Sequence, residues 1–156
     1  MKISIGQHAP DFTLYDDKKN KVTLSEQKGE KVLLLFFPLA FTSVCTKELC
    51  SVRDNIGMYN KFHAKVFGIS VDSLHTLAKF KEEQHLNFQL LSDFNKEVSE
   101  AYGALYPVFG YGMKGVSKRA AFVIDNDGFV RYAEVLENAS EVPNFQVIEK
   151  TLLSLS

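Results

Sequence analysis

A continuous apolar segment, Val32 to Phe37, constrains the fold of this chain more than any other part of its sequence. Such a run is typical of a strand buried on both faces of a sheet, whereas a half-exposed strand alternates apolar and polar residues. Pro38 follows directly and predicts the end of the strand, because proline lacks the backbone N–H that a ladder requires. Lys65 to Val71 predicts a second buried strand, and Phe88 to Leu91 a short third one.

Between and after these strands, apolar residues recur at the three- and four-residue steps of amphipathic helices. This spacing predicts a helix over residues 43–63, with Cys45 in its first turn, and further helices over 74–85 and 96–102. Pro143 lies near the first turn of a predicted closing helix, a position that proline favours. The apolar stripe of that helix consists of Phe145, Ile148, Leu152 and Leu155.

Two hairpins complete the predicted elements. Residues 11–24 alternate apolar and polar side chains about a charged turn, which indicates an N-terminal hairpin or two short edge strands. Segments 119–125 and 129–135 flank a turn in which Gly128 supplies a positive φ. Residues 103–117 are expected to be a loop. This order of strands and helices predicts an α/β fold with a central mixed sheet flanked by helices.

Length and composition narrow the function classes. The chain has 156 residues, 46% of them hydrophobic, which predicts one domain spanning residues 1–156. Lys and Arg (18) nearly balance Asp and Glu (19), so we expect neither nucleic acid nor a membrane surface as a partner. No apolar run approaches the ~20 residues of a membrane helix, and no signal-peptide segment is recognisable near the start. We therefore expect a cytoplasmic protein with a small neutral substrate.

Two cysteines, Cys45 and Cys50, are the residues with the most distinctive chemistry. They are too close in sequence to link distant parts of a fold and too few for a structural zinc site, and the four histidines lack metal-ligand spacing. Redox chemistry is one use that remains, and two inert buried thiols are the other. We expect no metal and no bound cofactor.

Cys45 lies where a strand has ended and a helix begins. The N–H groups and the positive dipole end of that helix would favour a thiolate, and such positions lower a thiol pKa from its free value of about 8.5. Thr42, three residues earlier, can donate its hydroxyl to the sulfur or to an oxygen atom of a bound substrate. The alternative is that Thr42 only caps the helix and Cys45 is a small buried residue.

The segment from Pro38 to Cys45 resembles the PxxxTxxC active-site motif of peroxiredoxins, and the resemblance covers nearly the whole chain. It is strongest to the bacterioferritin-comigratory (peroxiredoxin Q) and alkyl hydroperoxide reductase E branches. The resemblance implies a thioredoxin-like fold with an N-terminal β-hairpin extension. It also implies that Cys45 is the peroxidatic cysteine, which reduces hydrogen peroxide and organic hydroperoxides through a sulfenic acid. Thr42 would then orient the peroxide and Pro38 would shield the pocket from water.

Two charged residues, Arg119 and Glu48, match the family in the same way. Arg119 matches the arginine that reaches the site from a neighbouring strand, where a permanent cation would favour the thiolate; its alternative is a surface cation. Glu48 matches a glutamate of the peroxiredoxin Q motif and would hold either Arg53 or Arg119. A solvated helix charge is the alternative for Glu48.

Cys50 is the candidate resolving cysteine. On an intact helix, five residues rotate by ~500° and rise by ~7.5 Å, which leaves the two sulfurs beyond disulfide geometry. The peroxiredoxin Q arrangement implies that the helix opens and that a thioredoxin-like dithiol reduces the disulfide. The E branch implies that an external thiol resolves Cys45 instead. No second cysteine motif of the typical decamers is present, so we expect a monomer or homodimer.

Two other functions compete with this interpretation. A thioredoxin-like disulfide oxidoreductase normally needs a CxxC motif, which the chain lacks. A redox-sensing module, in which cysteine oxidation alters a partner contact, is compatible with the same residues.

Overall fold

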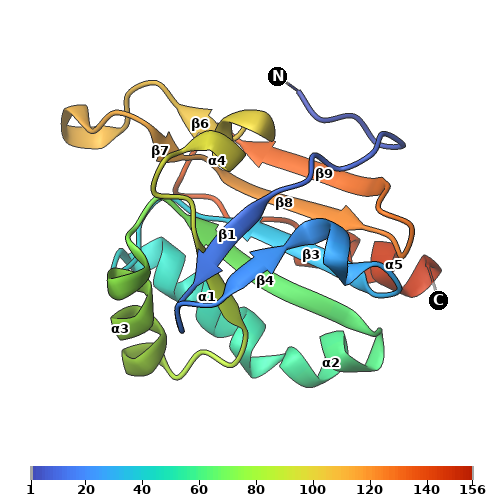
Figure 1. Cartoon of the computed structure of the whole chain (residues 1–156). Helices are drawn as coiled ribbons and strands as arrows, with labels where there is room; N and C mark the ends of the chain where they lie inside the picture. Colours follow the sequence, from blue (N-terminus) through green and yellow to red (C-terminus); the bar gives the residue numbers. More distant parts are fainter. Residues whose placement is uncertain (1, 156) are drawn as a thin grey trace.

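A mixed sheet of seven strands forms the centre of the computed structural model, which describes residues 2–155. Figure 1 shows the sheet with helices packed against it. The strands are β1 (Thr13–Asp16), β2 (Lys21–Thr23), β3 (Lys31–Phe36), β4 (Ala64–Ser70), β5 (Gln89–Ser92), β8 (Arg119–Ile124) and β9 (Val130–Leu136). The order across the sheet is β2-β1-β5-β4-β3-β8-β9. β4 runs parallel to β3 and β5, and the remaining pairs are antiparallel. The predicted mixed sheet is confirmed, and its two long apolar runs are central strands.

Helices cover the sheet, and the alternation of side chains along β3 explains how both faces are filled. The helices are α1 (Ser43–Asp54), α2 (Ile56–Lys61), α3 (Leu74–Gln84), α4 (Glu97–Ala101) and α5 (Phe145–Ser154). Leu33 and Leu35 belong to the core cluster that includes residues of α1, α3 and α5. Leu34 and Phe36 belong to the opposite cluster, which includes residues of α4 and of the N-terminal segment. No helix within residues 2–155 is long and apolar enough to cross a membrane.

The N-terminal hairpin is confirmed, and it extends the sheet. β1 pairs antiparallel with β2 and also with β5, so β2 forms the sheet edge. At the other edge, β8 and β9 form the predicted second hairpin, and Gly128 adopts the expected positive φ of 92°.

The prediction of one helix over residues 43–63 is wrong, because the helix breaks at Asn55. This residue has φ −115° and ψ 17°, and its side-chain amide donates to the carbonyl of Ser51. Val52 in α1 and Tyr59 in α2 are nevertheless both buried in the same core cluster. The apolar spacing therefore continues across the break and conceals it in the sequence.

The predicted loop over residues 103–117 contains more structure than expected. It includes two short strands, β6 (Leu105–Tyr106) and β7 (Val116–Ser117), which pair antiparallel, and the 3-10 turn η2 (Gly110–Gly112). A second 3-10 turn, η1 (Leu24–Gln27), follows β2. The two-residue strands are too short to give a periodic sequence signal.

Candidate active site

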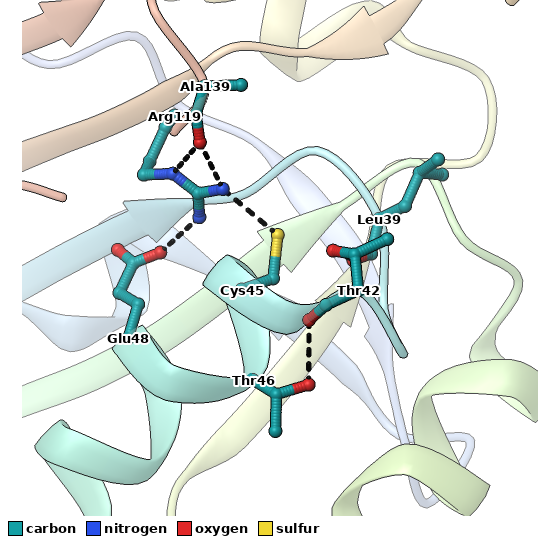
Figure 2. Close-up of polar contacts among 7 residues, drawn as sticks. All are labelled: Leu39, Thr42, Cys45, Thr46, Glu48, Arg119 and Ala139. Atoms are coloured by element: carbon teal, nitrogen blue, oxygen red, sulfur yellow. Dashed lines mark hydrogen bonds and ion pairs between the residues drawn. The ribbon is translucent and has the colours of Figure 1, made fainter. Parts of the chain in front are cut away.

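Cys45 is the third residue of α1, as the sequence predicts, and it is fully buried. β3 ends at Phe36, residues 37–42 cross the end of the sheet, and α1 begins at Ser43. In Figure 2 the side chain of Cys45 points away from the first turn of α1, and its sulfur faces the side chain of Arg119. A buried thiol in this position has helix N–H groups beneath it and a cation in front of it.

Arg119 reaches the thiol because β8 runs antiparallel to β3. Phe36 at the end of β3 pairs with Ala120, which places Arg119 beside the start of the loop that leads to α1. Side chains alternate along a strand, and Ala121 lies on the face that α1 covers, so Arg119 points to that face as well. Its Nη2 donates to Cys45 Sγ at 3.3 Å, and its side chain is 2% exposed. The alternative of a surface cation is therefore wrong.

Glu48 fixes the other side of the guanidinium. Its Oε1 accepts from Arg119 Nη1 at 2.6 Å, and its side chain is fully buried. Burial raises the pKa of Glu48 to about 7, although the neighbouring Arg119 acts to lower it. The second carboxylate oxygen, Oε2, is buried without a hydrogen-bond partner. Of the alternatives for Glu48, the structure selects Arg119 as its partner and excludes a solvated helix charge.

The carbonyl of Ala139 is a third partner of Arg119. It accepts from Nε at 3.1 Å and from Nη2 at 2.8 Å (Figure 2). Burial acts to lower the pKa of Arg119, but the adjacent Glu48 and Cys45 outweigh it and raise this pKa above its ordinary value. Arg119 is thus a fixed cation. The sequence carries no signal for Ala139, because every residue has a backbone carbonyl.

Thr42 and Pro38 belong to the loop before α1. Thr42 occupies the N-cap position, but its side chain does not cap the helix; its hydroxyl donates to the carbonyl of Leu39 at 2.8 Å. The carbonyl of Thr42 accepts from both N and Oγ1 of Thr46. The alternative that the Thr42 hydroxyl caps the helix is therefore wrong, whereas a contact of this hydroxyl with peroxide stays a prediction. Thr42 is exposed and Pro38 is buried.

Cys50 lies one turn and a half further along α1 and is half-buried. Its Sγ donates to Gln84 Oε1 of α3 at 3.6 Å, and both cysteines are free thiols. Arg53 does not contact Glu48: it forms an ion pair with Asp54 and donates to the Gln84 carbonyl at 2.6 Å. Arg53 therefore lies on the Cys50 side of α1, away from Arg119.

Comparison with known proteins identifies the family of the chain. Residues 5–133 match the AhpC/TSA family. Alkyl hydroperoxide reductase E of Mycobacterium tuberculosis is 40% identical over 136 residues, which cover 85% of this chain and 86% of that protein. The crystal structure of peroxidoxin BcpB from the same organism has a TM-score of 0.87 at 30% identity and 99% coverage of both chains.

A third comparison concerns the fold alone. The crystal structure of a peroxiredoxin-like protein from Aquifex aeolicus has a TM-score of 0.90 at 23% identity, covering 100% of this chain and 90% of that one. The central sheet and its flanking helices are thus the thioredoxin-like fold that peroxiredoxins share. The chain belongs to the AhpC/TSA family and is a peroxiredoxin, a thiol-dependent peroxidase.

Proposed function

We propose that Cys45 is the peroxidatic cysteine and reduces hydrogen peroxide and organic hydroperoxides. Its thiolate attacks one peroxide oxygen and the O–O bond breaks. The other oxygen leaves as hydroxide or alkoxide and takes up the proton that the thiol released on ionisation, which gives water or an alcohol. The sulfur becomes a sulfenic acid. The observation that carries this proposal is the 3.3 Å contact between Cys45 Sγ and the buried Arg119, since a fixed cation favours the anionic nucleophile.

The other residues of the site support this reaction in distinct ways. Glu48 and the Ala139 carbonyl hold the guanidinium of Arg119 in place. Its Nη2 therefore faces the sulfur before the reaction, and the side chain loses no further conformational entropy when the peroxide reacts. Pro38 covers the pocket against water. Thr42 is exposed on the loop before α1, and its hydroxyl would exchange the Leu39 carbonyl for a peroxide oxygen.

We also propose that Cys50 resolves the sulfenic acid. Its thiol displaces the hydroxyl from the Cys45 sulfur, which forms a disulfide and releases water. A thioredoxin-like dithiol then reduces this disulfide and restores both thiols. Because both cysteines lie in the intact helix α1, part of α1 must unwind before their sulfurs meet.

A one-cysteine cycle with an external resolving thiol is the second candidate. The contact between Cys50 and Gln84 favours it, because that contact holds the Cys50 sulfur against α3. A redox-sensing role predicts oxidation of Cys45 without sustained turnover.

One experiment tests Cys45 as the nucleophile and separates resolution by Cys50 from a one-cysteine cycle. Reduced wild type, Cys45→Ser and Cys50→Ser are each mixed with one equivalent of hydrogen peroxide, and peroxide loss and intact mass are followed. We expect wild type to consume peroxide and form the Cys45–Cys50 disulfide. Cys45→Ser should not react, and Cys50→Ser should complete one turnover and stop at the sulfenic acid. Wild type that accumulates Cys45 sulfenic or sulfinic acid would exclude resolution by Cys50, and full activity of Cys45→Ser would exclude the proposed nucleophile.

A further inference from the structure

The loop between β3 and α1, residues 37–42, has a conformation that its own sequence does not favour. Phe41 has φ 67°, in the left-handed region that glycine favours and a bulky side chain normally avoids. Its side chain is 48% exposed, and its ring packs in an edge-to-face arrangement with the Phe80 ring at a centroid distance of 5.2 Å. A strained residue of this kind persists when surrounding contacts determine the backbone around it.

Two hydrogen bonds do so: the Thr42 hydroxyl donates to the Leu39 carbonyl, and a carboxylate just after the end of β4 accepts from the loop backbone. The Ala40 N–H, one residue before Phe41, donates to Asp72 Oδ2 at 2.8 Å. The hydroxyl of Ser70 donates to the same oxygen at 2.7 Å and accepts from the Asp72 N–H at 3.2 Å. The Asp72 carbonyl in turn accepts from Ser92 Oγ at 2.7 Å.

These bonds fix Asp72 to the rigid part of the molecule. Ser70 is the last residue of β4 and is fully buried, and Ser92 is the last residue of β5. The central sheet therefore holds the carboxylate, and the carboxylate holds the loop. A hydrogen bond from an N–H to a charged carboxylate is stronger than one to a neutral oxygen, which suits a group that maintains a strained turn.

We infer that Asp72 is a positioning residue for peroxide reduction, which acts through the Ala40 N–H to hold the loop that carries Pro38 and Thr42. The inference rests on the proposed role of Cys45. Asp72 forms its hydrogen bonds with Ala40, Ser70 and Ser92, whereas the hydrogen bond to Cys45 Sγ comes from Arg119 on β8. The effect of Asp72 is therefore on where the peroxide is held.

This role separates two reactions of the same thiol. Attack on peroxide needs both a thiolate and an O–O bond held in line with it, whereas alkylation by iodoacetamide needs only the thiolate. We expect Asp72→Asn to lower the second-order rate constant for hydrogen peroxide by at least about tenfold, because small displacements of positioning groups have large effects on rate. The rate constant for alkylation of Cys45 should stay within about twofold of the parent value.

The experiment measures both rate constants in a Cys50→Ser background, so that Cys45 is the one thiol that reacts. Asp127→Asn is the matched control: it removes one carboxylate from an exposed turn at the far end of β8. If circular dichroism shows that Asp72→Asn does not fold, Ser70→Ala replaces it. This variant should also lower the rate constant for peroxide relative to that for alkylation, by a smaller factor than Asp72→Asn.

Each outcome decides the question. A fall in the peroxide rate alone supports the positioning role. Equal falls in both rates, or no fall in either, would overturn it, because Asp72 would then act on the thiolate or not at all. Failure of the proposed function is distinguishable, since the parent protein itself would then react with peroxide no faster than a simple thiol.

Discussion

Replacement of Glu48 by glutamine tests the electrostatics of the buried site. Burial raises the pKa of Glu48 from 4.5 to about 7. A carboxyl with a higher pKa in the folded than in the unfolded protein binds its proton more tightly when folded. Its contribution to stability is therefore complete below pH 4.5 and is lost as the pH rises to about 7. The difference between the two pKa values corresponds to about 3 kcal/mol, because one pKa unit is worth about 1.4 kcal/mol.

Urea unfolding at pH 5 and pH 8 measures this contribution. The Cys45→Ser variant is compared with the double variant Cys45→Ser, Glu48→Gln. The shared substitution removes oxidation and ionisation of the buried thiol. From pH 5 to pH 8, the free energy of unfolding of the protein with Glu48 should fall by about 2–3 kcal/mol relative to the glutamine variant. All groups common to both proteins cancel in this comparison. A difference that is constant within about 0.5 kcal/mol would refute the reasoning, because Arg119 would then keep Glu48 ionised throughout.

Three further predictions concern the site and the core beneath it. Arg119→Gln should lower the rate constant for peroxide by about 10²–10³, since it removes the cation at the sulfur; stopped-flow kinetics that show less than a tenfold loss would contradict this. Gln84→Ala should accelerate disulfide formation after peroxide addition by about two- to fivefold, because Cys50 loses its partner on α3. Quenched-flow mass spectrometry measures that rate, and an unchanged rate counts against it. Gly68→Ala should destabilise the fold by about 1–3 kcal/mol in urea unfolding, because its Cβ would lie 2.8 Å from Leu90 Cδ2 in the packed core; a neutral result would show that Leu90 moves freely.

The sheet was predictable because its central strands have no exposed face. A strand buried on both faces consists mostly of apolar residues, so β3 is visible as the apolar run that starts at Val32, although the strand itself begins at the buried Lys31. The boundary between α1 and α2 was not predictable in this way. Asn55 interrupts the backbone without moving the apolar residues off their common face, and hydrophobic spacing reports faces rather than hydrogen bonds.

The site shows a similar division. Cys45 was recognisable from its motif at the start of a helix, and Arg119 from the family resemblance at the start of a strand; the antiparallel pairing of β3 with β8 brings them together. The side-chain partners of the remaining groups were not. Glu48 had two basic candidates on or near its helix face, and the choice of Arg119 depends on burial that the sequence does not display. The supporting role of Asp72 depends on where two strands end together.

The contacts of Arg119 differ in how they respond to oxidation. Its four hydrogen bonds run to Glu48, the Ala139 carbonyl and Cys45. Only the sulfur changes charge in the proposed reaction, because a thiolate becomes a neutral sulfenic acid. A neutral partner binds a guanidinium less strongly than an anion does. We therefore expect Arg119 to stay in place after oxidation, held by Glu48 and Ala139, while its hold on the first turn of α1 weakens.

Because oxidation weakens only the contact between Arg119 and Cys45, we expect α1 to unwind from its N-terminal end. The N-terminal end lacks a side-chain cap and, once Cys45 is oxidised, also the charged contact that tied it to β8. The C-terminal half keeps the bond from Arg53 to the Gln84 carbonyl, which does not change with oxidation. The helix should therefore open from its first turn, so that Cys45 moves toward Cys50. Hydrogen exchange of the oxidised Cys50→Ser protein would then show loss of protection before residue 48 and retained protection after it.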